Sequence, residues 1–438
     1  MLLSKRKVLF LLAVILSMAP AAASAQLLTL QEGLRMVTEE SRLVKIMHEE
    51  ERMAREDTLL AKSRFLPKAN ASYGQTFLEH QPGAHLGSLI VETAERSFYS
   101  YRIAVQEIIY DFGGIAFLYE EAKLREETKR LDTKRVRNRV ALDFAVIYFD
   151  TLEAEKLIAV ANKEIESLES HRAVAKALFD DGVITENELL QAEVSLADAR
   201  KKLLFAENLK RISGARLNSL LTRPLEKPVS VAEFSRPLGS TATFEEAVGK
   251  AERERPEMQI VEASLKALEL EEKARRSEYF PQFLAQGQYD YTKNKYLTYQ
   301  ENLGITFRMN FNLWSGGSTR AEVEKARLAQ SRLRIERTRL ADEIRLELER
   351  YSLDTANAIE RVSVARGALS QAQENLRIER QKYGEGVGIA ADVTDAIALA
   401  ALSETNYYRA LYDYYRSGAR FLYAMGENLA EEYGRQDK

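Results

Sequence analysis

Residues 344–376, IRLELERYSLDTANAIERVSVARGALSQAQENL, decide the architecture of this chain. Small or apolar side chains recur in this stretch at alternating steps of four and three residues, at Ile344, Leu348, Tyr351, Thr355, Ala358, Val362, Ala365, Leu369, Ala372 and Leu376. This spacing places them in one line along a helix and is typical of the seam where two helices of a coiled coil meet. The stretch therefore predicts a long helix that packs against a neighbouring helix.

The predicted helix ends in a sharp reversal of the chain. The sequence Tyr383-Gly-Glu-Gly-Val-Gly388 places three glycines close together, and glycine permits the positive φ angles of a tight turn. A second helical pattern begins near Asp392. We therefore expect a long helix, a tip turn and a returning helix.

An earlier part of the chain repeats this pattern. A shift of 204 residues places Val140, Phe144, Ile147, Thr151, Ala154, Ile158, Ala161 and Ile165 on residues 344–369, and places Phe179 and Gly182 on Tyr383 and Gly386. We interpret the chain as an internal duplication, in which each half contains the same series of elements.

Residues 1–25 have the composition of a secretory signal peptide. Lys5, Arg6 and Lys7 precede an apolar run over residues 8–16, and small residues lead up to Ala25. The alternative is a membrane anchor, but the run is far shorter than the ~20 residues that span a bilayer. We therefore predict export from the cytoplasm and a mature chain that begins at Gln26.

Each half is also predicted to begin with a helix of its own, which precedes the long coiled-coil helix. Capping boxes at residues 29–32 and 243–246 open the two helical patterns, which extend to Pro67 and Pro281 with a constant offset of 214 residues. These signals predict single helices over about 30–66 and 244–280. The expected organisation is a signal peptide (1–25), a first repeat (26–222), a proline-rich linker or non-helical belt (223–242), a second repeat (243–426) and a C-terminal tail (427–438).

Between these helices and the long ones, the apolar pattern changes to a period of two. Leu303, Ile305, Phe307, Met309 and Phe311 alternate with polar or small residues, as Tyr289 and Tyr291 do on the preceding strand. Residues 69–77 and 99–105 alternate in the same way. We predict one β-hairpin in each repeat, over about 68–112 and 282–314, with extra residues of the first repeat in the loop 80–96.

Aromatic residues are concentrated in these hairpins. Residues 65–112 and 279–314 contain 18 of the 38 aromatic residues, and the candidate membrane-interface residues are Tyr73, Phe77, Tyr99, Tyr101, Tyr289, Tyr291, Phe307, Phe311 and Trp314. Aromatic girdles at strand ends, with one apolar face, are typical of outer-membrane β-barrels. A soluble sandwich is the alternative, but the sequence predicts no further strands for a second sheet.

Four strands cannot close a barrel, and lipid does not tolerate an open sheet edge. The chain must therefore form an oligomer. A dimer would provide eight strands, whose interior side chains fill, whereas a trimer would provide twelve and leave a lumen.

Composition excludes several other functions. The mature chain has an excess of acidic over basic residues, which argues against nucleic acid as a partner. The absence of cysteine excludes disulfides and thiolate sites. The four histidines, His48, His80, His85 and His171, are scattered and predict no metal site, and we find no nucleophile with a base, so neither an enzyme nor a cofactor is predicted.

The duplicated order of helix, hairpin, long helix, tip and helix resembles the TolC-like outer membrane efflux proteins. The paired prolines and glycines and the tip sequences Phe-Asp-Asp-Gly-Val and Tyr-Gly-Glu-Gly-Val carry this resemblance across the whole mature chain. It implies a mainly α-helical protein that forms a homotrimer, with a 12-stranded barrel in outer-membrane lipid and a long α-helical barrel in the periplasm. It also implies docking of the tips, at Gly182, Val183, Gly386 and Val387, to a periplasmic adaptor and an inner-membrane transporter.

The resemblance further implies the residues of a gate. Asp392 and Asp395 match carboxylates that line the pore of the family, although both could equally be carboxylates favoured at a helix start. Tyr383 matches a tyrosine that bonds a carboxylate at Glu188 beside a polar position at Asn187, and Glu188 could instead cap its own helix. Gly388 stands where the family has an arginine, so the latch departs from the family pattern.

Two classes of function remain open at this point. The first is a passive trimeric export channel for efflux or type I secretion. The second is a periplasmic coiled-coil scaffold or adaptor, whose hairpins would pack on a partner instead of in lipid. Recovery of the protein in the membrane fraction would favour the channel, and recovery in the soluble periplasm would favour the scaffold. Neither function identifies the exported substrate.

Overall fold

The computed structural model describes residues 27–235 and 243–434. The predicted signal peptide therefore lies outside the described residues, as do part of the predicted linker and the last four residues. Contacts between residues divide the chain into two compact units, each described here by itself. We refer to residues 27–45, 137–235, 243–248 and 347–434 as the tip unit, and to residues 46–136 and 249–346 as the sheet unit.

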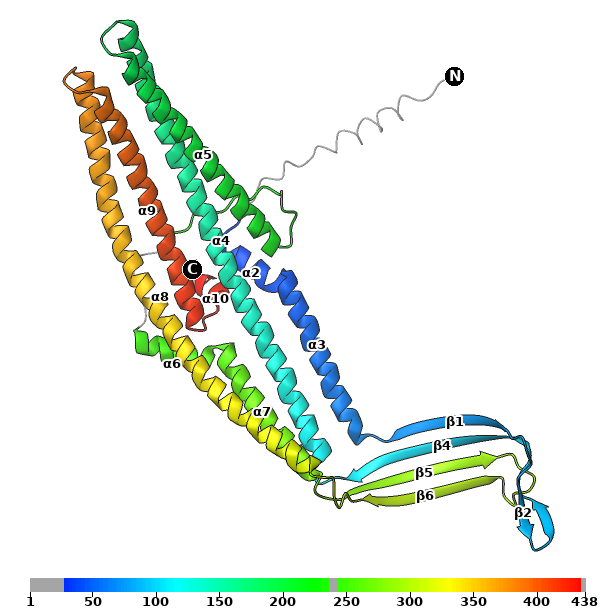
Figure 1. Ribbon diagram of the computed structural model, residues 1–438. Coiled ribbons are helices and arrows are strands. Elements are labelled where there is room, and N and C mark those ends of the chain that lie inside the picture. The colour runs from blue at the N-terminus through cyan, green and yellow to red at the C-terminus, as the bar shows by residue number, and fades with distance from the viewer. Residues whose placement is uncertain (1–26, 236–242, 435–438) are drawn as a thin grey trace, which may run out of the picture. The chain divides into compact units, whose positions relative to one another are not determined.

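Both halves of the chain contain the same series of elements (Figure 1). The first half consists of α2 (Leu30–Glu40), α3 (Arg42–Lys62), a 3-10 turn η1 (Ser63–Phe65), β1 (Lys68–Phe77), β4 (Ser97–Tyr110), α4 (Gly114–Asp180) and α5 (Glu186–Leu220). The second consists of α6 (Phe244–Glu254), α7 (Pro256–Ser277), β5 (Gln282–Thr292), β6 (Glu301–Asn310), α8 (Ser318–Gly384) and α9 (Ala390–Ala424), followed by α10 (Leu429–Gly434). The long helices α4 and α8 have 67 residues each, and the returning helices α5 and α9 have 35 each.

The seam predicted from residues 344–376 is the buried line of α8. Six of its ten positions are buried, including Leu348, Ala358 and Val362, which are fully covered, and the other four are half-buried. Thr355 fits among them because its hydroxyl donates to the carbonyl of Tyr351 at 2.7 Å, so no donor is left without a partner.

The prediction of one continuous helix at the start of each half is wrong. The chain leaves the helical conformation at Ser41, whose Oγ accepts from the N–H of Val44 at 3.3 Å, and at Arg255, which has extended backbone angles. Pro256 explains the second break, because proline lacks an N–H and disfavours the helical conformation of the preceding residue. The two breaks are 214 residues apart and so occupy the same place in the duplication.

The two predicted hairpins form a single sheet. The strand order is β1-β4-β5-β6, all antiparallel, and β4 pairs with β5 to join the halves. The register aligns Ala71, Ile103, Tyr289 and Leu303 in one row and Ser72, Arg102, Asp290 and Asn302 in the next. Because successive residues point to opposite faces, this register confirms the predicted separation into an apolar face and a polar face. The sheet of the single chain is open, with β1 and β6 at its edges.

The loop 80–96 contains a small hairpin that the sequence analysis did not predict. Strands β2 (Gly83–Leu86) and β3 (Leu89–Glu92) pair through a turn at Gly87, whose φ of 65° requires a residue that tolerates the left-handed region. The buried Asn294 of the β5–β6 turn holds the base of this hairpin, since its Oδ1 accepts from the N–H of Glu95 at 3.3 Å.

The predicted linker is partly built into the core of the tip unit. The buried Tyr148 of α4 donates to the carbonyl of Ala232 at 2.6 Å, and Leu28 pairs with Val231 as an isolated bridge. The ring of Phe234 packs between Phe149 and Tyr415, with ring centroids 5.2 Å and 5.1 Å away. These contacts tie Leu28 and residues 231–234 to α4 and α9.

We expect Gly33→Ala to destabilise the tip unit. A Cβ at Gly33 would lie 2.0 Å from Cζ of Phe144, a ring with no exposed surface. Overpacking of this kind costs about 1–3 kcal/mol, which exceeds the roughly 1 kcal/mol by which alanine favours a helix over glycine. Chemical unfolding of the purified protein measures the difference.

The duplication provides matched controls for this substitution. In the second half, Ala247 and Leu348 occupy the positions of Gly33 and Phe144, and both are buried. The first half thus pairs glycine with the large phenylalanine, and the second half pairs the larger alanine with the smaller leucine. Phe144→Leu should therefore restore much of the stability lost in Gly33→Ala. Gly249→Ala, whose Cβ would have Arg253 Nη1 at 3.9 Å as its nearest neighbour, should not destabilise the protein. Equal unfolding midpoints for Gly33→Ala and the parent would contradict the predicted clash.

Candidate functional site

The two tip turns have the same hydrogen-bonding pattern. In the first, the N–H of Gly182 donates to Phe179 O at 2.9 Å and the N–H of Val183 to Leu178 O at 2.8 Å; Gly386 and Val387 repeat both bonds to Tyr383 and Lys382. This is a Schellman motif, which ends a helix through a residue in the left-handed conformation. Gly182 and Gly386 adopt it with φ of 71° and 75°. Of the three glycines in the second tip, Gly386 is the one with a positive φ, which confirms the predicted tight turn.

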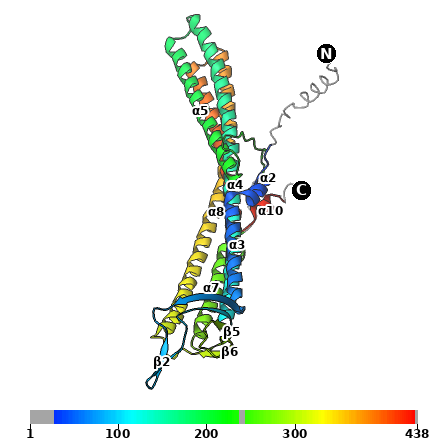
Figure 2. The ribbon, with the colours of Figure 1, turned by 90° about the vertical axis from the view of Figure 1, so that its right-hand side faces the viewer.

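The valine after each tip glycine is exposed. A Schellman motif usually packs an apolar residue at this position back onto its own helix, but Val183 is 68% exposed and Val387 is 76% exposed. Both turns lie at the same end of the tip unit (Figure 1 and Figure 2). The tips thus present two apolar side chains to the outside.

The predicted gate carboxylates lie on the first turns of α9. Asp392 and Asp395 are three residues apart, so they share one side of the helix, and both are exposed. Neither forms an ion pair or side-chain hydrogen bond with the residues that the structure describes. A pore role and a helix-start role are both compatible with this geometry.

The predicted latch residues Tyr383, Glu188 and Asn187 form no hydrogen bond with one another in the single chain. The Oη of Tyr383 is buried and has no hydrogen-bond partner among the described residues. Burial, and secondarily the negative charge of Glu188, raises the pKa of Tyr383. Glu188 instead forms the capping box of α5, in which its Oε1 accepts from the hydroxyl of Thr185 at 3.4 Å. The neighbouring Asn187 is exposed.

His171 is a buried titratable group that the sequence analysis did not single out. It is 5% exposed, its ring packs on that of Tyr383 at 5.4 Å, and its Nε2 has no partner among the described residues. Next to it, Leu168, Leu196, Ala199, Val393 and Ile397 form a core that joins α4, α5 and α9. A single histidine in a helical pattern has no sequence signal that would distinguish it from an exposed one.

The apolar face of the sheet has aromatic side chains at both ends. Away from the helices, Tyr73, Tyr99, Tyr101, Tyr289 and Tyr291 stack with centroids 4.9–6.2 Å apart, and Phe77 is exposed beside them. At the end next to the helices, Phe112 packs on Tyr110 and Phe280 with centroids at 4.8 Å and 4.7 Å, and Phe307, Phe311 and Trp314 are exposed. Tyr291 and Phe283 mark the two ends of β5, about 26 Å apart along a strand that rises ~3.3 Å per residue.

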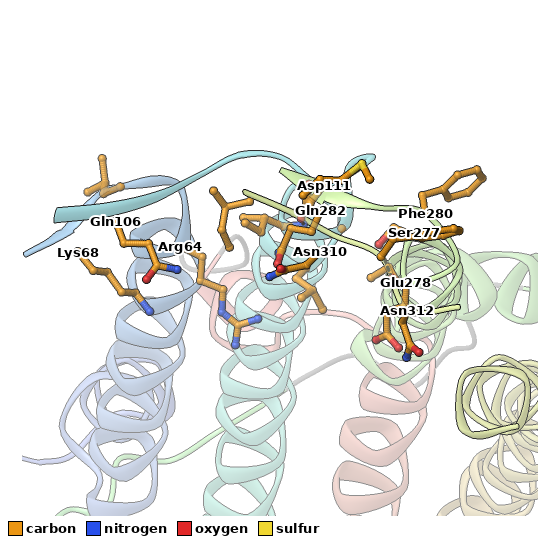
Figure 3. Close-up of a pocket in the computed structure, with 18 of the residues that line it drawn as sticks. Arg64, Lys68, Gln106, Asp111, Ser277, Glu278, Phe280, Gln282, Asn310 and Asn312 are labelled. Atoms are coloured by element: carbon orange, nitrogen blue, oxygen red, sulfur yellow. Dashed lines mark hydrogen bonds between the residues drawn. The ribbon is translucent and has the colours of Figure 1, made fainter. Parts of the chain in front are cut away.

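The polar face carries a connected network. Asp290 pairs with Arg102 across β4 and β5 and accepts from Gln288 at 2.8 Å, and Gln288 accepts from Gln286 at 3.0 Å. Where this face meets the helices there is a hollow of about 1280 Å³. Arg64, Lys68, Gln106, Asp111, Gln282 and Asn310 project into it (Figure 3).

None of the helices in the described part of the chain is both long and apolar enough to cross a membrane. Nor do the described residues contain a group of three or more histidines and carboxylates that could hold a metal ion.

Acidification is expected to loosen the packing around His171. Burial lowers the pKa of His171 from 6.5, a nearby Arg380 charge lowers it further, and a hydrogen bond to the backbone at Ala390 opposes the shift. As the pH falls below about 6.5, the unfolded chain therefore binds more protons than the folded one. The free energy of unfolding of this region thus rises with pH and decreases on acidification. Amide exchange of residues 165–176 and 383–397, corrected for the intrinsic rate, should be faster at about pH 5.5 than at pH 7.5.

His171→Gln is the matched variant, because it keeps a polar side chain that does not titrate. Its exchange rates should change less between the two pH values than those of the parent. The same pH response in parent and variant would assign the effect to other groups.

Comparison with known proteins agrees with this arrangement. A family described as outer membrane efflux protein matches residues 33–223 and 247–427. No match is found among the curated proteins.

Several solved structures have a similar fold. A membrane protein from Pseudomonas aeruginosa is 16% identical, with a TM-score of 0.81 over 92% of this chain and 91% of that one. The outer membrane protein VceC from Vibrio cholerae is 11% identical, with a TM-score of 0.78 over 91% and 96%. The CmeC outer membrane channel of Campylobacter jejuni is 14% identical, with a TM-score of 0.76 over 93% and 89%. The resemblance carried by the duplicated elements and tip motifs is thereby confirmed, and the chain belongs to the TolC-like outer membrane efflux protein family.

Proposed function

We propose that three copies of this chain form an outer-membrane channel that serves as the exit duct of a tripartite efflux or type I secretion system. The observation that carries this proposal is the open four-stranded sheet, which has an apolar face exposed along its length. Leu303, Ile305 and Phe307 of β6 are 74–80% exposed. Exposed apolar patches of this kind mark surfaces that another phase or molecule covers.

The edges of the sheet support a closed assembly. In a bilayer every backbone N–H and C=O must be paired, so β1 and β6 need partners. If β6 of one copy pairs with β1 of the next, three copies complete twelve strands around a lumen. The strands have 10–14 residues, and a transmembrane strand needs ~9–11.

The charged side chains on the apolar face fit the same arrangement. Glu301 lies in the row of Tyr73, Tyr101 and Tyr291, and Glu107 lies in the row of Ala285 and Phe307. Both acids are therefore next to an aromatic group at one end of the strand, where headgroups and water would solvate them.

The helices would extend the duct into the periplasm. The exposed Val183 and Val387 at the tips would dock to a periplasmic adaptor, and an inner-membrane transporter would supply the energy. The chain itself would act as a passive conduit without a cofactor or catalytic residues.

The gate would lie at the tips. Three-fold symmetry would gather Asp392 and Asp395 of three copies into acidic rings that favour cations. The free hydroxyl of Tyr383 could reach Glu188 or Asn187 once the capping box opens. A Cβ at Gly388 would lie 3.0 Å from the backbone N of Tyr383, so an arginine there would require the turn to shift slightly. The proposed latch would therefore rely on fewer bonds than the family pattern, or on another basic residue.

A periplasmic scaffold remains the second candidate, because the apolar face could be covered by another protein. Recovery of the intact protein from the soluble periplasm without detergent would favour the scaffold and reject the channel.

Adjacent substitutions on opposite faces of β6 should differ sharply in effect. Ile305→Arg places a charge in the middle of the proposed lipid face, where it costs about 2–4 kcal/mol, so we expect cross-linking of the membrane fraction to show little trimer. Thr306→Arg places the same charge on the polar face and should leave the trimer intact. If both variants assemble equally well, the proposed facing of the sheet is wrong.

Neutralising the tip carboxylates should change ion selectivity. Asp392→Asn with Asp395→Asn removes six proposed charges from the trimeric pore, so the reversal potential of single channels in a KCl gradient should shift towards lower K⁺ preference. Glu385→Gln, an exposed carboxylate in the turn itself, serves as the comparison and should have a smaller effect. No shift in the double variant would return both aspartates to a helix-start role.

A further inference from the structure

The polar face of the sheet has an excess of positive charge. Strands β1, β4, β5 and β6 place three basic residues on this face, Lys68, Arg102 and Arg308, and one acidic residue, Asp290. The two oxygens of Asp290 are both engaged, one by Arg102 and the other by Gln288. Lys68 and Arg308 are therefore left without a carboxylate.

These two residues lie at the same end of the sheet. Lys68 is the first residue of β1, and Arg308 comes two residues before the end of β6, so both are next to the helices. Both are exposed, and neither forms an ion pair or side-chain hydrogen bond within the described residues. Arg64 of η1, equally exposed and without such a partner there, projects with Lys68 into the hollow below the sheet (Figure 3).

The acidic side chains that line this hollow are already engaged. Asp111 accepts from the N–H of Ile115 at 2.7 Å and from that of Gly113 at 3.2 Å, where it caps the start of α4. Glu278 pairs with Arg275 at 3.1 Å. Neither carboxylate forms an ion pair with Arg64 or Lys68, so the positive charge of both side chains is uncompensated within this hollow.

We propose that Arg64, Lys68 and Arg308 form a basic belt that binds anions at the junction of the barrel and the helices. The inference rests on the proposed function, because closure of the sheet makes the polar face the wall of the lumen. Since β1 and β6 are the edge strands, closure also brings Lys68 of one copy towards Arg308 of the next. Three copies then contribute nine cations at one level of the duct.

The ligands of such a belt are small molecules that carry a carboxylate or phosphate group, and simple anions. Rings of arginine and lysine select anions and phosphates in other pores, because their charge replaces part of the hydration that the ion loses. The belt has the opposite sign to the acidic rings proposed at the tips. Anionic cargo would therefore be retained on the barrel side of the duct once it has passed the tips.

Single-channel recording of the full-length protein tests the belt. In a KCl gradient around 0.1 M, Arg64→Gln, Lys68→Gln and Arg308→Gln combined should lower the Cl⁻/K⁺ permeability ratio by about two-fold or more. The shift should shrink near 1 M salt, where the Debye length falls from ~10 Å to ~3 Å. Inorganic phosphate should reduce the chloride current of the parent more than that of the triple variant.

Arg102→Gln with Asp290→Asn is the matched control, because it removes one charge of each sign from the same face. The Cl⁻/K⁺ permeability ratio of this control should equal that of the parent. An equal shift in the control and the triple variant would overturn the belt. An unchanged ratio in the triple variant would overturn it as well. If the triple variant does not assemble, Lys68→Gln and Arg308→Gln are measured separately, and each should shift the ratio in the same direction. A parent protein that forms no channels would instead reject the proposed function.

Discussion

A strand at the edge of a sheet leaves a row of N–H and C=O groups without partners, and this chain has two such edges, on β1 and β6. The same sheet exposes apolar side chains on one face and polar ones on the other. Water satisfies the edges but not the apolar face, and lipid satisfies the apolar face but not the edges. A closed ring of strands in a bilayer satisfies both, and the proposed trimer is based on that constraint.

The duplication explains why one chain can supply an antiparallel sheet of this kind. Each half contributes a hairpin between a short helical pair and a 67-residue helix, and β4 pairs with β5 to merge the two hairpins. The halves are not identical where they pack. Gly33 lies against the ring of Phe144 in the first half, whereas the second half has Ala247 and Leu348 at the equivalent positions. Compensating changes of this kind allow the repeats to diverge in sequence while keeping helix lengths.

Charge is distributed unevenly over the surfaces that we propose line the pore. The tips carry Asp392 and Asp395 without partners among the described residues, and the polar face of the sheet carries Lys68 and Arg308 in the same condition. Many carboxylates and cations on the helices are instead paired, as in the contacts of Arg416 with Asp150 and Glu153 at 2.8 Å and 2.7 Å. Unpaired charges of one sign in rows that an oligomer would bring together are therefore better explained by ions or cargo than by stability of the single chain.

The element order, the long helices, their tips and the two faces of the strands could all be predicted from the sequence, because heptad spacing, alternation and tip glycines are local signals that do not depend on the packing. The sequence analysis missed features that depend on tertiary contacts. Ser41 interrupts the first helix without a proline to announce it, and the loop 80–96 folds into a hairpin anchored by Asn294. The sequence left open whether residues 223–242 form a linker or a non-helical belt, and of these Ala232 and Phe234 contact Tyr148 and Phe149. The unpaired state of Lys68 and the burial of His171 likewise depend on which groups lie nearby in space. Burial and pairing are properties of neighbours that are distant in the chain, so only the folded structure could assign them.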